Sequence, residues 1–334
     1  IGQYVYERVD SPEDRQALFW GDFSAEDFGY GRTDTPWQRW TVSEVSVEAP
    51  VIAHGRASIA VTVRGPGIRS ARCEYALESG RKTLEVNWLL DKVHETGIEA
   101  VFVAFPFNLR KPSFRADVNG VPFSPNTDQL NGTVRDWYPI GRWVDVGDGQ
   151  RGVTVTPLDA PLMHVGGITT GKWARILEPE GPTLMSWALH NHWMVNFKAS
   201  QGGEIPLRYR LTTHAGAVDD VAAFRFGAES ATPPLVLRDY LRTGPETGRF
   251  LDVPANAPVL VTTKPAEDGN GVIVRVQNLA RTEQTVLLRV LAAAPKSAAL
   301  TSPVEIDAGV LAVSDGAVNV PVKALAVQSV RVRF

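Results

Sequence analysis

Two histidines, an asparagine and a tryptophan stand side by side in the run HNHW, residues 190 to 193. Residues two apart lie on the same face of a β-strand, so His190 and His192 could hold a metal ion if a third ligand came from a neighbouring strand. No carboxylate shares the local spacing, and the whole chain has 6 histidines. We therefore favour a polar groove, and predict that this chain binds no metal.

Strict alternation along this strand would place Trp187 and Leu189 on one face, with His190, His192 and Asn196 on the other. Neutral imidazoles and an amide exchange hydrogen bonds with sugar hydroxyls without the desolvation cost of a full charge. The histidine-bearing face is therefore predicted to be a carbohydrate-contact edge. The alternative is that the two histidines are buried and have only a structural role in the strand.

Neighbouring segments carry further candidates for the same edge. Asp159 and His164 in the stretch PLDAPLMHVGG could close one end of a groove, although a turn in which the Asp159 carboxylate accepts a backbone N–H is the favoured alternative. Trp137 or Trp193 could supply an aromatic face on which a sugar ring stacks, and core packing is an equal alternative for Trp137. The candidate carbohydrate-contact residues are His190, His192, Asn196, Asp159, His164, Trp137 and Trp193.

Composition and charge exclude several function classes. The 334 residues include 34 basic and 37 acidic side chains, a net charge of −3, with no basic block of the kind that neutralises phosphates, so nucleic acid is not expected as a partner. The single cysteine, Cys73, excludes an intrachain disulfide. No apolar run approaches the roughly 18 residues of a membrane span, so no membrane contact is expected. The sequence is compatible with either a cytoplasmic or an exported protein.

Short alternating or apolar runs broken by Gly, Pro, Asn and Asp predict an all-β protein. Helical turns are expected only in SPEDRQALFW and DDVAAFRFGAES. The amino-acid composition changes between ATPPLVL and LDVPANAPVLVTT. Aromatic residues are frequent before this region, and Val, Ala and Leu are frequent after it. We therefore predict a large two-sheet β-domain over residues 1–255 and a small β-sandwich over residues 256–334.

Three segments resemble, in family order, the C-terminal β-region of glycoside hydrolase family 38, the α-mannosidase-like enzymes. They are KTLEVNWLLDKVHETGIEAVFVAFPFNL, DWYPIGRWVDVGDGQRGVTVTPLDAPL, and ALHNHWMVNFKASQGG followed by LRYRLT. The third contains a pattern similar to the family's NxWxxNFxxSQGG signature. The likeness covers roughly residues 75 to 215, and it implies a galactose-mutarotase-like β-supersandwich followed by a small β-sandwich.

The resemblance also implies where the family's chemistry lies. Retaining glycosidases need two carboxyl groups about 5 Å apart, and family 38 enzymes add a zinc ion held by His and Asp, all in an N-terminal α/β domain. This sequence has no α/β texture and no match to the His-x-Asp motif. We therefore assign no catalytic residue and no cofactor to this chain. It is expected to brace a catalytic domain in the same or another chain, to contact a mannoside or related glycan, and to be inactive alone.

Three alternatives remain open at the level of sequence. A sugar epimerase or mutarotase would use a histidine and a carboxylate, for which Asp159, His164, His190 and His192 supply the types. A stand-alone carbohydrate-binding module would need only aromatic and amide groups. A polysaccharide lyase would need Tyr, Arg and His to handle a uronate, for example Tyr138, Arg142 and His164.

Overall fold

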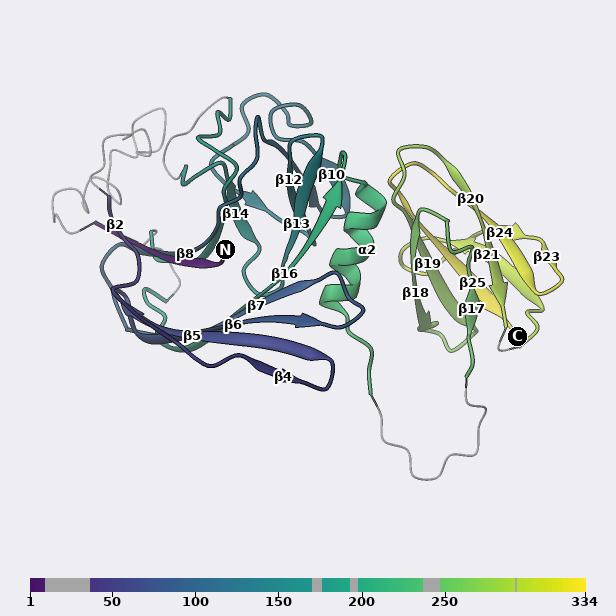
Figure 1. Ribbon diagram of the computed structural model, residues 1–334. Helices are drawn as coiled ribbons and strands as arrows, with labels where there is room; N and C mark the ends of the chain where they lie inside the picture. Colours follow the sequence, from purple (N-terminus) through teal and green to yellow (C-terminus); the bar gives the residue numbers. More distant parts are fainter. Residues whose placement is uncertain (10–36, 170–175, 193–197, 237–246, 292) are drawn as a thin grey trace. The chain divides into compact units, whose positions relative to one another are not determined.

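The computed structural model describes residues 1–9, 37–169, 176–192, 198–236, 247–291 and 293–334 (Figure 1). Among the described residues, strands make up 52% and helix 4%, which confirms the all-β prediction. Two compact units are present, residues 1–218 with 226–231, and residues 219–225 with 232–334. The second unit includes β17 (Leu251–Asp252), which lies before the boundary predicted near residue 255.

The first unit contains two antiparallel sheets, and many of their strands are labelled in Figure 1. The six-stranded sheet has the order β11 (Tyr138–Pro139), β14 (Leu162–Val165), β15 (Leu184–His190), β8 (Glu99–Phe105), β1 (Gln3–Arg8) and β2 (Gln38–Trp40). The ten-stranded sheet has the order β10 (Val121–Phe123), β9 (Ser113–Val118), β12 (Val144–Gly147), β13 (Arg151–Pro157), β16 (Gly203–Ala215), β7 (Leu84–Lys92), β6 (Ile68–Glu78), β5 (Arg56–Gly65) and β3 (Glu44–Val47), with β4 (Val51–Ala53) also paired to β5.

One hydrophobic core joins the inner faces of these two sheets. In the ten-stranded sheet, β7 turns Val86, Trp88 and Leu90 inward, and β16 alternates in the same way. In the six-stranded sheet, β8 contributes Val101 and Val103 to this core. The period-2 alternation that predicted strands is therefore the pattern that builds a two-sheet sandwich.

Strand β8 is also buried on its second face. Its alternate residues belong to a smaller hydrophobic group on the outer side of the six-stranded sheet, here called the outer cluster. The members of the outer cluster are Ala100, Phe102, Ala104, Met185 and Trp187. All seven residues of β8 are consequently buried, which explains why the sequence EAVFVAF is almost continuously apolar.

The predicted helix near residue 220 is present as α2 (Asp220–Ala231). Asp219 caps it, because its carboxylate accepts hydrogen bonds from the backbone N–H groups of Val221 at 2.9 Å and Ala222 at 3.2 Å. The other expected helical turn, residues 11–20, lies outside the described residues. No described helix is long and apolar enough to cross a membrane.

The second unit is a small β-sandwich of its own. Its four-stranded sheet has the order β17, β20 (Gln284–Val290), β24 (Ala317–Val322) and β23 (Val313–Ser314). Its five-stranded sheet has the order β18 (Val259–Pro265), β19 (Val272–Asn278), β25 (Val327–Arg333), β21 (Ser297–Thr301) and β22 (Asp307–Leu311). Valines dominate the core between them, as the Val-rich tail of the sequence predicted.

Candidate functional site

A β-bulge in β15 changes the faces expected for the HNHW region. The pairing with β8 shifts between Trp187 and Leu189, so Trp187 lies opposite Phe102 while His190 lies opposite Ala100. Ala188 is the extra residue, so Leu189 turns toward the core opposite Val101 and His190 lies on the same face as Trp187. The expectation that Trp187 and His190 point to opposite faces is therefore wrong: their rings stack at 4.1 Å.

Three histidines gather around Trp187 on the outer side of the six-stranded sheet, which we call the histidine face. The Trp187 ring lies 5.1 Å from that of His164 and 5.2 Å from that of His192, and the two rings of His190 and His192 are 5.4 Å apart. Trp137 joins the group at 5.3 Å from Trp187. The structure thus brings together four of the seven residues predicted from sequence.

Burial keeps these imidazoles neutral at physiological pH. Loss of solvent lowers the pKa of His164 to about 3 and that of His190 to about 4, and it holds the pKa of His192 well below its usual range. His190 is half-buried, whereas His164 and His192 are buried. Neutral imidazoles can both donate and accept hydrogen bonds, which is the property that sugar hydroxyls require.

The hydrogen bonds of His164 fix its tautomer. Its Nδ1 accepts the backbone N–H of Thr169 at 3.2 Å, while the Thr169 hydroxyl donates to the carbonyl of Asp136. A neutral imidazole that accepts at Nδ1 carries its proton on Nε2. That Nε2 atom has no hydrogen-bond partner among the described residues, and the ring sits edge-on to Phe102 at 5.5 Å.

Sequence reasoning missed a carboxylate on the same face. Glu7 of β1 and His190 of β15 both lie opposite Ala100, so the small alanine separates a carboxylate from an imidazole. Arg39 donates to Glu7 Oε1 at 2.6 Å, and Oε2 has no partner among the described residues. Burial raises the pKa of Glu7, and Arg39 offsets only part of that shift. Only the pairing of β1 with β8 brings Glu7 here, so no local motif could reveal it.

A pocket of about 410 Å³ opens beside His190. At its inner end the Lys92 ammonium group binds Glu99 Oε1 at 2.6 Å, and the Tyr6 hydroxyl donates to Glu99 Oε2 at 2.7 Å. Lys92 and Glu99 are both buried between the two sheets. The residues lining this His190 pocket are Lys92, Glu99, Leu189, His190, Asn191, Lys198, Ser200 and Gln201. It is therefore lined mainly by hydrogen-bonding groups.

Asn191 fastens the loops at the rim of this pocket. Its Oδ1 accepts the backbone N–H of Glu99 at 2.7 Å, and its Nδ2 donates to the carbonyls of Gly97 at 2.6 Å and Ala199 at 3.3 Å. Asn191 stands just after the last residue of β15, and its own backbone N–H also donates to the carbonyl of Glu99 at 3.2 Å. Its role here is to hold the pocket's walls together.

Replacing Asn191 with alanine is expected to lower the free energy of unfolding of the first unit by about 2 kcal/mol, because it leaves backbone groups without partners. Urea unfolding followed by tryptophan fluorescence measures this. Asn131→Ala, in an exposed loop, is the matched control and should change the free energy by less than about 0.5 kcal/mol. Equal effects of the two substitutions would show that Asn191 has no fastening role.

Asp159 lies away from the histidines. Its carboxylate accepts the backbone N–H of Arg208 at 2.7 Å and binds the Arg208 guanidinium at 2.8 Å and 3.0 Å. Burial raises the pKa of Asp159, but the hydrogen bonds from Arg208 outweigh it and hold the pKa below its usual range. Arg208 points outward from β16, because Leu207 and Tyr209 point into the core. The expected grouping of Asp159 with His164 is therefore not formed, and the backbone N–H that Asp159 accepts belongs to strand β16 and not to its own turn.

Two further candidates, Trp193 and Asn196, lie outside the described residues. In contrast, Trp37 is a residue that sequence reasoning overlooked, and its ring lies 4.9 Å from that of His192. Within the described part of the chain, no group of three or more His, Cys, Asp or Glu side chains could hold a metal ion. The chemistry that this face offers is hydrogen bonding and ring stacking.

The sequence matches no protein-family model and no curated protein. Solved structures do match. An α-mannosidase from Enterococcus faecalis V583 aligns with 100% of this chain at a TM-score of 0.67 and 14% identity, and a protein in glycosyl hydrolase family 38 from Enterococcus faecalis aligns equally well. The chain has a family 38-like fold.

This family 38-like chain spans 38% and 40% of the length of those two proteins. The likeness confirms the fold that the three sequence segments implied. A putative aldose 1-epimerase from Escherichia coli K12 overlaps 50% of the chain at a TM-score of 0.29, which is too low to support an argument about activity.

Proposed function

We propose that this chain is the non-catalytic β-region of an α-mannosidase-like glycoside hydrolase. In this role it braces a separate α/β catalytic domain and contributes a carbohydrate-contact edge to it. The observation that carries the proposal is the position of His190, which stacks on Trp187 and also lines the polar pocket of about 410 Å³. The full-length fold likeness to family 38 structures supports the assignment to this class of protein.

The chemistry of the histidine face suits a neutral sugar such as a mannoside. Half-buried His190 and Trp137 offer an imidazole and an indole face, and Ser200 and Gln201 add hydroxyl and amide groups in the adjoining pocket. Sugar hydroxyls pair with such groups, while the ring's C–H faces pack on aromatic surfaces. We assign no nucleophile, acid/base group or zinc ligand to this chain. Those groups belong to the proposed partner domain.

The alternatives fit the geometry less well. An epimerase would need Asp159 as its carboxylate, but Asp159 is paired with Arg208. The carboxyl group in the His190 pocket, Glu99, is paired with Lys92. A lyase set of Tyr138, Arg142 and His164 is not assembled either. Tyr138 pairs with core-facing Met163, so it lies on the opposite face of the sheet from His164. Burial also raises the pKa of Tyr138 to about 12.

Replacing His190 and His192 together with alanine is expected to weaken binding of methyl α-mannoside at least tenfold, because both imidazoles on the contact edge are removed. The measurement is NMR titration of the chain, alone and with a family 38 catalytic domain added, followed by the tryptophan indole and backbone resonances. The matched control is the double substitution His54→Ala with His94→Ala, since both of these histidines are exposed.

The mannoside titration also distinguishes a stand-alone binding module from a contact edge. Binding by the isolated chain would favour a stand-alone binding module, whereas binding or turnover only in the presence of a catalytic domain would favour the contact-edge role. Unchanged mannoside affinity in the His190 and His192 double variant, with its fold intact by circular dichroism, would remove the histidine face from the proposal.

A further inference from the structure

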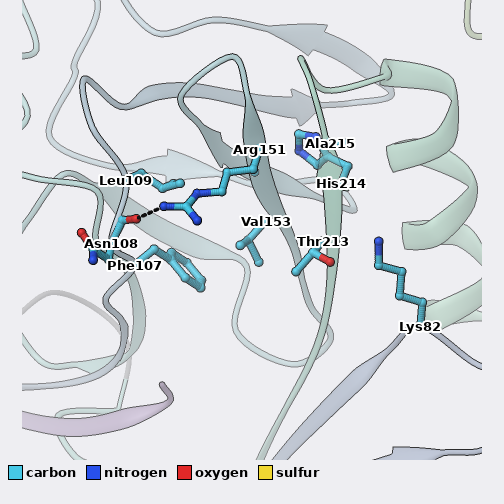
Figure 2. A pocket seen from close by; sticks show the side chains of 10 residues that line it. Lys82, Phe107, Asn108, Leu109, Arg151, Val153, Thr213, His214 and Ala215 are labelled. Carbon is cyan, nitrogen blue, oxygen red and sulfur yellow. Dashed lines mark hydrogen bonds between the residues drawn. The ribbon is translucent and has the colours of Figure 1, made fainter.

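A second pocket of about 430 Å³ lies elsewhere in the first unit (Figure 2). Strand β13 begins on one side of it and strand β16 ends on another, while the segment after β8 and the turn before β7 complete the wall. The lining residues are Lys82, Phe107, Asn108, Leu109, Arg151, Gly152, Val153, Thr213, His214 and Ala215. We call it the cationic pocket.

The lining of the cationic pocket contains basic side chains and no carboxylate. The Arg151 guanidinium and the Lys82 ammonium group are drawn on either side of Val153 and Thr213 in Figure 2, and neither forms an ion pair with any described residue. The nearby Asp148 does not line the pocket, and its carboxylate accepts the backbone N–H groups of Gln150 and Arg151. A local excess of cations is notable in a chain of net charge −3.

Arg151 is held toward this pocket. Its guanidinium donates to the carbonyl of Asn108 at 3.3 Å, the contact dashed in Figure 2. A guanidinium has five N–H donors, so most of them remain available for a carboxylate or a phosphate. The neighbouring Phe107 ring and the Leu109 and Val153 side chains form an apolar floor. A ligand that fits must therefore carry negative charge and also present C–H surface.

A buried network positions His214 in the wall of the pocket. Its Nε2 lies 2.9 Å from Asp145 Oδ2, and the Thr154 hydroxyl donates to the same oxygen at 2.7 Å. The imidazole reaches Asp145 by passing over Gly152, where a Cβ atom would come within 2.4 Å of His214 Nε2. Glycine at this position is what allows β16 to place an imidazole across β13.

The cationic pocket continues into a neighbouring one of about 410 Å³ that shares Lys82, Phe107, Val153 and Thr213. The second pocket adds Arg81 and again has no carboxylate in its lining. Its other lining residues are Ile1, Leu77, Thr83, Leu84, Leu211 and Thr212. We call these two adjoining pockets together the elongated site.

We propose that this elongated site binds a short acidic oligosaccharide, whose carboxylate or phosphate groups pair with Arg151 and Lys82 while a ring packs on Phe107. The site is separate from the histidine face, and the choice of a sugar as its ligand rests on the glycan-handling function proposed above. It would give a glycan-handling protein a second contact that selects for charge.

The test is calorimetric titration of the full chain with trigalacturonate, a phosphorylated mannotriose, inorganic phosphate and neutral mannotriose. We expect one of the two acidic sugars to bind at least tenfold more tightly than both mannotriose and inorganic phosphate, and which of them binds tells carboxylate from phosphate. Arg151→Gln and Lys82→Gln should each weaken that binding at least fivefold. Raising the salt from about 50 mM to 500 mM should weaken it further, because screening reduces charge attraction.

Lys296→Gln removes the same charge from an exposed position in the second unit and should leave acidic-sugar binding unchanged. The His190→Ala and His192→Ala double variant should also keep it, which separates this proposal from the one for the histidine face. Equal binding of inorganic phosphate and the acidic sugars would reduce the site to an adventitious anion site. Affinity that is unchanged in Arg151→Gln and Lys82→Gln, or undetectable for both acidic sugars at millimolar concentration, would overturn the proposal.

Discussion

Lowering the pH from 7 to 4 is expected to destabilise the first unit by several kcal/mol, with the buried histidines His164 and His192 as main contributors. In the unfolded chain an imidazole has a pKa of about 6.5, whereas burial lowers the folded pKa of His164 to about 3 and that of His190 to about 4. Below pH 6.5 these histidines therefore bind protons in the unfolded state but stay unprotonated in the folded state. The stabilisation is complete above pH 6.5 and is lost as the pH falls toward the folded pKa values.

For His164 alone, a shift of this size corresponds to a loss on the order of 4 kcal/mol. Urea unfolding at pH 7, 6, 5 and 4 measures it, and the comparison with His164→Asn isolates the histidine from carboxylates that titrate in the same range. His54→Asn, at an exposed position, serves as the control. If the stability of wild-type and His164→Asn protein falls in parallel between pH 6.5 and 4, His164 is not buried in its neutral form.

The second large effect is expected from the buried pair beside the His190 pocket. Lys92→Met should lower the free energy of unfolding by about 3 to 5 kcal/mol, because it leaves the Glu99 carboxylate buried without its counter-charge. The Tyr6 hydroxyl would remain as a partner of Glu99 at 2.7 Å, and one hydrogen bond cannot replace an ammonium group. Denaturant unfolding at pH 7 gives the value.

A double variant distinguishes loss of the pair from loss of packing. Replacing both partners, Lys92→Met with Glu99→Leu, should restore much of the stability, since apolar groups of similar size often replace a buried ion pair at little cost. Arg69→Met breaks the exposed pair with Asp91 and should cost at most about 1 kcal/mol. A Lys92→Met effect as small as that of Arg69→Met would mean that water reaches Glu99 in the folded protein.

Sequence alternation was sufficient to predict the sheets but not the faces of every strand. The class, the two-sheet first unit and the Val-rich second sandwich follow from period-2 patterns such as those of β7 and β16. The bulge at Ala188 carries no marker, since alanine is acceptable in either a regular or a bulged strand. One extra residue was enough to invert the expected relation between Trp187 and His190.

Partners that are distant in the chain account for the rest of the candidate site. Glu7 meets His190 only through their shared neighbour Ala100, and Asp159 meets Arg208 from 49 residues away. A single sequence gives no measure of such pairings. The sequence could suggest His164, His190 and His192 as a group because the chain has 6 histidines. It could not show that Arg208 of the ten-stranded sheet would bind Asp159.

The burial of β8 on both faces makes it a reporter in hydrogen exchange. Its backbone amides are enclosed between β1 and β15 and covered above and below, so they should exchange with deuterium only when the whole first unit opens. In the second unit, the interior strand β19 can serve as the corresponding reporter, because it pairs with β18 on one side and β25 on the other. Exchange rates of these two strands would therefore give the opening free energy of each unit separately, from one uncut protein in native buffer.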